Sequence, residues 1–171
     1  MGGLTLKVFI MKNLKDKLKN AEKILVLGVG SELRGDDIAG IVIAGKIEKN
    51  KAVKNNPKVK VIYGYTAPEN FTGEIKKFNP SHIILVDCAD MGKSFGDVEI
   101  IEKEKILSTA FSTHSLPIKI MIDYIKESIN AETIVIGIQP ENIKFGEKVS
   151  DSAKKAISKV SREIVKILKT P

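Results

Sequence analysis

Three continuous apolar runs constrain the fold of this chain most. They are KILVLGVG at residues 23–30, HIILVDCAD at 82–90 and ETIVIGI at 132–138. A strand on a half-solvated sheet alternates apolar and polar residues, whereas a strand covered on both faces is an unbroken apolar stretch. We therefore predict that these runs are central strands of a parallel sheet. KVKVIYG at 58–64 alternates, so we expect that strand nearer an edge.

Segments with helical spacing lie between the strands. The last of them places Ala153, Ile157, Val160, Ile164 and Leu168 on one inner stripe. Helices are predicted over residues 11–21, 36–49, 68–78, 112–129 and 148–169, and a further strand over 96–102. Strands that alternate with helices indicate an open α/β sheet. We expect a single three-layer α/β domain over residues 1–171, with a twisted, mostly parallel sheet, helices on both faces and residues 1–22 as an N-terminal helical extension.

Composition and charge exclude several classes of protein. The net charge of the 171 residues is +7, but the lysines are spread along the chain rather than clustered. Without Trp, and with three Tyr and six Phe, a surface for stacking bases is not expected, so no nucleic-acid partner is predicted. The single Cys88 excludes an internal disulfide and a Cys-based zinc cluster. Lys7 and Lys12 break the only apolar patch near the start, so we expect a cytoplasmic protein with no membrane contact.

Polar side chains gather where the predicted strands end. In an open α/β sheet, this edge carries the working site. The candidates are Asp36 and Asp37 after the first strand, Thr66 and Glu69 after the second, Asp87 and Asp90 at the third, Gln139 and Glu141 after the last, and His114 before a long helix. Two carboxylates and one imidazole suit a divalent transition ion such as zinc, nickel, iron or manganese.

Each candidate also has a structural interpretation. Asp36 or Asp37 alternatively caps the helix that follows, and adjacent helical residues point about 100° apart, so at most one of them should face the cleft. A carboxylate at Asp87 is harder to explain structurally, because it enters the edge of the core. His114 alternatively is a surface residue, and His82 is expected to be structural. Cys88 is expected to be a small buried residue.

The glycine loop after the first strand does not fit a nucleotide site. The dinucleotide fingerprint requires glycine at position 33, which is Leu33 here. A P-loop requires Lys and Ser or Thr after Gly35, which is followed instead by Asp36 and Asp37. Two acids at a helix N-terminus repel the pyrophosphate that the helix dipole would attract. We therefore exclude phosphate binding at this loop.

Five sequence blocks stand in order along most of the chain. They are VLGVGSELRGDDIAG (26–40), GYTAPEN (64–70), ILVDCADMG (84–92), STHSLP (112–117) and GIQPEN (137–142). Together they resemble the hydrogenase maturation proteases, the endopeptidases that trim the large subunit of NiFe hydrogenases. The resemblance is greatest to the branch that processes the hydrogenase of formate hydrogenlyase, and it implies a phosphorylase/hydrolase-like fold.

The resemblance also implies site residues. The metal ligands of the family carry over onto Asp37, Asp87 and His114, which become the expected catalytic and metal-binding residues. In this family the ligand is the second of the paired acids, so Asp36 is left as the capping residue. The chain has Ser31 where the family usually has Asn, which puts any amide-specific hydrogen bond there in doubt. It has Ile38 where the family often has glycine, and neither departure touches the three proposed ligands.

The implied substrate is the precursor large subunit of a NiFe hydrogenase, already loaded with nickel. The expected activity removes its C-terminal peptide, and the nickel belongs to the substrate rather than to a resident cofactor. The ion either polarises the scissile carbonyl and activates water, or is only recognised while a carboxylate acts as general base. Thr66, Glu69 and Gln139 are expected to position the peptide, and a monomer is expected. The alternatives are a metal-delivery module without peptidase activity and, disfavoured by Leu33, a nucleotide-binding regulator.

Overall fold

The computed structural model describes residues 12–111 and 115–169. Its strands are β1 (Ile24–Val29), β2 (Val59–Tyr65), β3 (His82–Asp90), β4 (Val98–Ile101), β5 (Ala110–Phe111) and β6 (Glu132–Ile138). Its helices are α2 (Ala39–Glu48), α3 (Lys51–Lys54), α4 (Thr72–Phe78), α5 (Ser115–Ile129) and α6 (Asp151–Lys169), with short 3-10 helices η1 (Gly35–Ile38), η2 (Pro68–Phe71) and η3 (Lys103–Ser108). Residues 12–17 form a further helical segment.

The sheet is mixed, with a parallel centre. Its strand order is β2-β1-β3-β6-β4, and β5 pairs with the end of β3. β2, β1, β3 and β6 run parallel, whereas β4 and β5 are antiparallel to their neighbours. From β1 the chain goes to β2 on one side and then to β3 on the other, so the strand order reverses between β1 and β3. Ligands of open α/β sheets bind at such a reversal, beyond the carboxyl ends of the strands.

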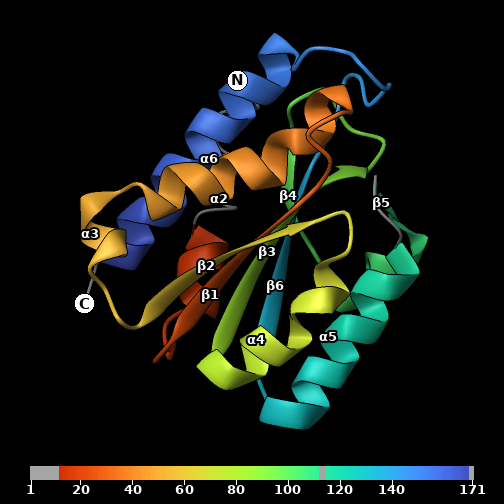
Figure 1. The fold of residues 1–171 in the computed structure, drawn as a ribbon. Helices are drawn as coiled ribbons and strands as arrows, with labels where there is room; N and C mark the ends of the chain where they lie inside the picture. The colour runs from red at the N-terminus through yellow and green to blue at the C-terminus, as the bar shows by residue number, and fades with distance from the viewer. Residues whose placement is uncertain (1–11, 112–114, 170–171) are drawn as a thin grey trace.

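Helices cover both faces of the sheet, as predicted. Figure 1 shows α2, α3 and α6 on one side and α4 and α5 on the other. The two cores take alternate residues of each strand, because successive side chains of a strand point to opposite faces. On β3, Ile84, Val86 and Cys88 pack toward α2 and α6, while Ile83, Leu85 and Ala89 pack toward α4 and α5.

Two glycines allow α2 to lie directly against the sheet. A Cβ added at Gly40 would lie 2.2 Å from the carbonyl oxygen of Val86 and 2.3 Å from that of Val29. A Cβ at Gly28 would lie 2.4 Å from the carbonyl oxygen of Gly40. Helix and strand backbones therefore touch at this point, and any side chain there would force them apart. This contact fixes the start of α2, and with it the loop that carries the paired acids.

The predicted elements are present, with differences at their ends. Strands β1, β2, β3 and β6 confirm the predicted strands to within about one residue, and β2 lies at the edge of the sheet. The helix predicted from residue 36 begins at Ala39, because η1 forms its first turn. The helix predicted over 68–78 is divided between η2 and α4. Helix α6 begins at Asp151 rather than at 148, and its predicted inner stripe is buried.

Within residues 12–111 and 115–169, no helix combines the length and the apolar character needed to cross a membrane.

A pair of glycine substitutions tests the backbone contact between α2 and the sheet. We expect Gly40→Ala to lower the free energy of unfolding by about 3 kcal/mol, the upper part of the usual range for overpacking. Gly73 is the matched control in α4, since a Cβ there meets nothing within 4 Å. Gly73→Ala should raise the free energy of unfolding by roughly 0.5–1 kcal/mol through helix propensity. Urea denaturation measures both, and equal effects of the two substitutions would contradict the close contact.

Candidate active site

The paired acids after β1 are both buried. Asp36 is 0% exposed and Asp37 is 1% exposed, and both lie in η1, which packs against β3. Burial of an ionised carboxylate is unfavourable by several kcal/mol unless hydrogen bonds or a cation compensate for it. Each acid therefore needs its own set of partners.

Asp37 turns back toward the loop that leaves β1. Its Oδ2 accepts a hydrogen bond from the backbone N–H of Ser31 at 3.1 Å. Gly30 allows this, because its φ of +138° favours glycine and a Cβ there would lie 1.8 Å from the carbonyl oxygen of Asp37. Since the contact uses the backbone of residue 31, Ser31 supplies it as well as asparagine would.

Asp36 has a different role from the one predicted. Its carboxylate accepts hydrogen bonds from the backbone N–H groups of Glu141 (2.8 Å), Asn142 (3.1 Å) and Ser150 (2.6 Å), and from Ser150 Oγ (2.9 Å). No side-chain cap occurs at η1 or α2, so the prediction that Asp36 caps its own helix is wrong. Asp36 binds the loop of residues 139–150 between β6 and α6, which we call the β6–α6 loop.

The same network begins α6. Ser150 Oγ donates to Asp36 and accepts a hydrogen bond from the backbone N–H of Ala153 at 3.1 Å, which is the bond of a serine N-cap. The backbone N–H of Asp36 also donates to the carbonyl oxygen of Asn142 at 2.8 Å. One buried carboxylate thus holds together the end of β1, the β6–α6 loop and the start of α6.

Asp87 lies where β1 leaves the sheet. It is 0% exposed, and the last pair between β1 and β3 is Gly28 with Val86. By strand alternation Asp87 belongs to the face covered by α4 and α5. Its Oδ1 accepts a hydrogen bond from the backbone N–H of Cys88 at 2.8 Å. The prediction of an acid at the edge of the core is confirmed in position, and it lies at the reversal of strand order.

Cys88 joins the two acidic segments. Its Sγ donates a hydrogen bond to the carbonyl oxygen of Asp36 at 3.0 Å, and its side chain is fully buried. Burial raises the pKa of the Cys88 thiol well above its usual value, and the nearby carboxylates of Asp87, Asp37 and Asp36 raise it further. The thiol therefore stays protonated at neutral pH and is no thiolate nucleophile.

Of the two histidines, the structure describes His82. His114 lies outside the described residues. His82 opens β3 at the opposite end of the strand from Asp87, where its Nδ1 is 3.0 Å from Ser81 Oγ, as expected of a structural residue. Burial lowers the pKa of His82. Within the described part of the chain, no three acidic, histidine or cysteine side chains form a metal-binding group.

Gln139 holds the loop between β3 and β4. Its Oε1 accepts hydrogen bonds from the backbone N–H groups of Met91 (2.7 Å) and Lys93 (3.2 Å), and its Nε2 donates to Asp90 Oδ1 at 3.1 Å. This bond and the N–H of Gly92 lower the pKa of Asp90. Glu141 accepts from Ser152 Oγ at 2.7 Å.

Further residues lie near the carboxyl ends of the strands. Thr66 and Glu69 are exposed near η2. Sequence reasoning missed Ser150, although a serine directly before an amphipathic helix is a recognisable N-cap signal.

A surface cavity of about 290 Å³ lies away from these acids, beside β4 and α5. It includes Lys17, Lys126, Glu102 and Glu132. Lys17 pairs with Glu102 at 3.8 Å and Lys126 with Glu132 at 3.4 Å, so both lysines are already neutralised. With Lys103 and Glu104 the lining carries three basic and three acidic side chains, so it favours neither an anion nor a cation, and the buried acids remain the candidate site.

The chemistry of the site is anionic. Asp37 and Asp87 are buried from solvent, and each accepts a hydrogen bond from a backbone N–H group. Carboxylate oxygens at the same sheet edge, one from η1 and one from β3, fit a hard or borderline cation and repel phosphate. The donor set therefore suits a divalent metal ion.

The chain is similar to known proteins over most of its length. A family model described as hydrogenase maturation protease matches residues 41–167. A putative hydrogenase maturation protease of Methanocaldococcus jannaschii is 39% identical over 159 residues, which cover 91% of this chain and 94% of that relative. The hydrogenase 3 maturation protease of Escherichia coli K12 is 35% identical over 141 residues, 82% of this chain and 87% of the relative.

Solved structures give the same match. The crystal structure of a NiFe hydrogenase maturation protease, HycI of Thermococcus kodakarensis, has a TM-score of 0.83 and 30% identity, and covers 92% of this chain and 99% of that one. The endopeptidase HybD of Escherichia coli has a TM-score of 0.70 at 20% identity, a likeness of fold. The predicted three-layer α/β fold is confirmed.

Asp36→Asn tests the buried network around that carboxylate. The amide would place an NH₂ group against backbone N–H donors whichever way it turned, because both carboxylate oxygens accept from such donors. We expect the free energy of unfolding to fall by about 2–4 kcal/mol. Asp16 is exposed, so Asp16→Asn is the control and should change stability by less than about 0.5 kcal/mol. Chemical denaturation that gives similar values for the two variants would contradict the network.

A thiol reagent tests the state of Cys88. Because the thiol is buried and held protonated, Ellman's reagent at neutral pH should not react with the folded protein, and should react with one thiol per chain in denaturant. Absorbance at the wavelength of the released thiolate gives both rates. Fast, stoichiometric reaction of the folded protein would show an accessible thiolate and make Cys88 a candidate nucleophile.

Proposed function

Because the chain belongs to the hydrogenase maturation proteases, we propose that it removes a C-terminal peptide from the nickel-loaded precursor of a NiFe hydrogenase large subunit. The observation that carries this proposal is the burial of Asp37 and Asp87 on either side of the reversal in strand order. The acid that anchors the loops on this side of the sheet is their neighbour Asp36.

The ligands of the substrate's nickel, in this proposal, are Asp37, Asp87 and His114. Asp37 comes from η1 and Asp87 from β3, which are in contact. His114 immediately precedes α5 in sequence, and α5 covers the face to which Asp87 belongs. Carboxylates and imidazole are suitable donors for nickel. The ion is part of the substrate, so an empty precursor would give these residues nothing to bind.

Two chemical routes would use this arrangement. In one, the nickel polarises the scissile carbonyl and activates a water molecule. In the other, the nickel only positions the precursor, and one of the two carboxylates accepts a proton from the attacking water as general base. Both routes require buried carboxylates near the cleaved bond, and both make cleavage depend on nickel in the precursor. We also propose that the chain acts as a monomer.

A processing assay tests the proposed function. The protein is incubated with nickel-loaded precursor large subunit, and the mass of the precursor is followed. We expect loss of a C-terminal peptide, and no loss when the precursor lacks nickel. A full-length, nickel-loaded precursor that persists with folded protein present would contradict the protease. Nickel transfer without cleavage would instead support the metal-delivery module.

Substitutions test the ligand assignment in the same assay. We expect Asp37→Asn, Asp87→Asn and His114→Gln each to reduce cleavage by at least roughly 100-fold, because each removes a ligand of the ion. His82→Gln is the matched control, since His82 lies at the other end of β3, and it should cleave at the parent rate. Thermal melting checks that each variant is folded. Parent-like cleavage by a folded His114→Gln protein would remove His114 from the site.

A further inference from the structure

Two large apolar side chains are exposed on neighbouring loops at the candidate site. Phe145 is 77% exposed and Leu33 is 62% exposed, more than any other large hydrophobic residue in the described part of the chain. Leu33 lies in the loop between β1 and η1, and Phe145 lies in the β6–α6 loop. A single exposed apolar residue is ordinary and needs no explanation. Two on adjoining segments are less common.

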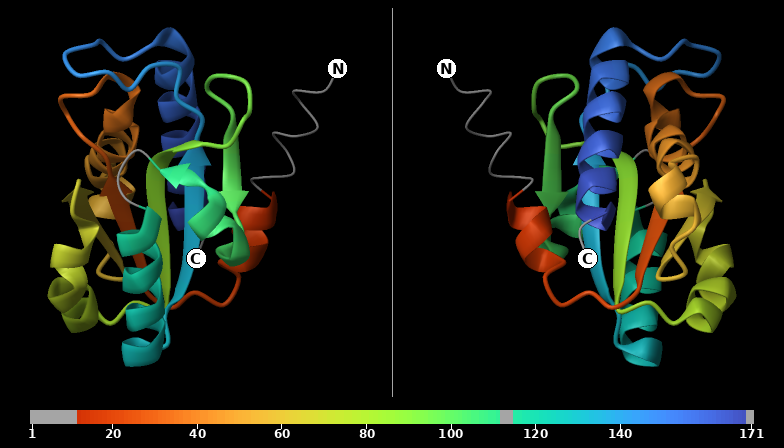
Figure 2. Two further views of the ribbon diagram at one scale, coloured as in Figure 1. Left: turned by 90° about the vertical axis from the view of Figure 1, so that its right-hand side faces the viewer. Right: turned by 90° about the vertical axis from the view of Figure 1, so that its left-hand side faces the viewer.

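Hydrogen bonds join the two loops at these residues. The backbone N–H of Gly146 donates to the carbonyl oxygen of Leu33 at 2.9 Å. The Nε of Arg34 donates to the carbonyl oxygen of Ile143 at 3.1 Å. In both views of Figure 2 the loops after β1 and β6 lie side by side at the same end of the sheet. We call the surface formed by Leu33 and Phe145 the apolar ridge.

The ridge is held rigidly from beneath. The Asp36 carboxylate binds residues 141, 142 and 150 of the β6–α6 loop. Asp36 itself lies in η1, directly after the loop that carries Leu33. Gly35, with a φ of +51°, lets the chain pass so near that a Cβ would lie 2.5 Å from the carbonyl oxygen of Asn142. A surface that is already ordered loses little conformational entropy when a partner binds.

We propose that the apolar ridge is a docking surface for the folded body of the precursor large subunit. This proposal rests on the proposed function and specifies which surface of the protease recognises the body of its substrate. The loop that carries Leu33 leads directly into η1 and Asp37, so a protein bound on the ridge is held beside the buried acids. The ridge would supply binding energy from a part of the substrate remote from the cleaved bond.

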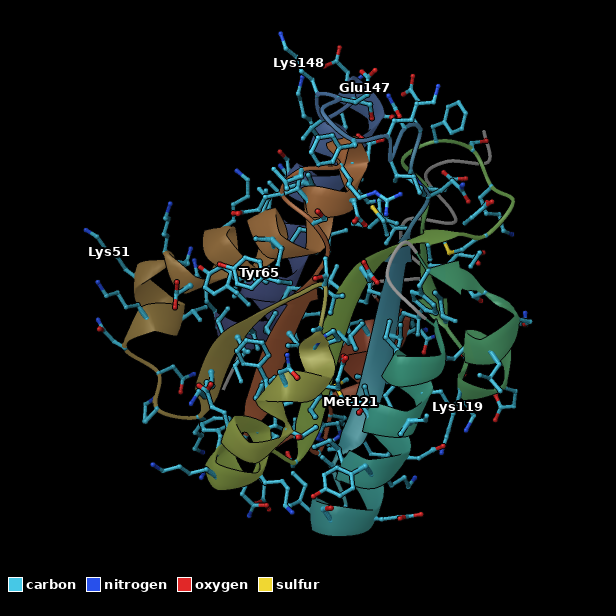
Figure 3. The ribbon with its side chains drawn as sticks, turned by 45° about the vertical axis from the view of Figure 1, so that its right-hand side comes forward. Lys51, Tyr65, Lys119, Met121, Glu147 and Lys148 are labelled. Carbon is cyan, nitrogen blue, oxygen red and sulfur yellow. The ribbon has the colours of Figure 1, made fainter. Side chains whose placement is uncertain are left out.

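The surroundings of the ridge suit a protein partner. Apolar anchors inside a polar rim are the usual composition of a protein interface. Lys144, Glu147 and Lys148 flank Phe145, and Figure 3 shows Glu147 and Lys148 pointing outward at this end of the molecule. Charges of both signs there do not favour an anionic lipid surface or a nucleic acid, each of which would select a positive patch.

Kinetics of the full-length protein test the ridge. With nickel-loaded precursor as substrate, we expect Leu33→Ala and Phe145→Ala each to raise KM roughly 10-fold while kcat stays within about twofold of the parent, because they remove contacts made equally in the bound and transition states. Leu107→Ala and Tyr124→Ala are matched controls, since these residues are 53% and 46% exposed on η3 and α5. Both controls should keep the parent KM.

The outcomes separate this proposal from the proposed function. A parent protein that never cleaves the precursor contradicts the proposed function itself. A parent that cleaves, with KM of Leu33→Ala and Phe145→Ala within twofold of the parent value, overturns the ridge alone. The parent protein could instead form a concentration-dependent dimer that both variants abolish while KM stays unchanged. That result would show that the ridge binds a second copy of this chain, and it would also overturn the proposal. Equal melting temperatures of the variants and parent exclude unfolding as the cause of a raised KM.

Discussion

The burial of the Asp36 carboxylate is the constraint on which the candidate site depends. An ionised group that is 0% exposed must receive hydrogen bonds, and its four donors come from residues 141, 142 and 150. These donors lie more than a hundred residues from Asp36 in the chain. The first and last thirds of the sequence therefore have to fold together before η1 is correctly placed. Asp37 takes its position from this placement.

Adjacent acids consequently have separate tasks. Asp36 faces the β6–α6 loop and stabilises it, while Asp37 faces the loop after β1 and belongs to the anionic site with Asp87. The strand, glycine turn and helix have the order of a phosphate loop, and Gly28 and Gly40 give the same close packing of helix on strand. Buried carboxylates in place of phosphate-binding N–H groups change the preferred ligand from an anion to a cation. Cys88 connects the two acidic segments as a protonated thiol.

Sequence patterns predicted the features that depend on local spacing. The apolar runs predicted β1, β3 and β6, and alternation predicted β2 at the edge, because burial of a strand is recorded in its own residues. The position of Asp87 followed in the same way. The role of Asp36 could not be predicted, since its partners are distant in sequence and most are backbone groups that any residue supplies. The contacts of Gln139 could not be predicted for a related reason: they are to backbone N–H groups of the loop after β3.

The central claim is that Asp37 and Asp87, with His114, bind the nickel of the substrate. Nickel K-edge X-ray absorption of the complex between this protein and a nickel-loaded precursor tests it most directly. The account predicts additional oxygen or nitrogen neighbours around nickel when the complex forms, at about 2.0–2.2 Å by analogy with other first-row ions. It also predicts that the complex of the precursor with an Asp87→Asn protein shows fewer additional neighbours around nickel than the complex with the parent protein. Identical nickel spectra for the free precursor and for its complex with the parent protein would contradict the account.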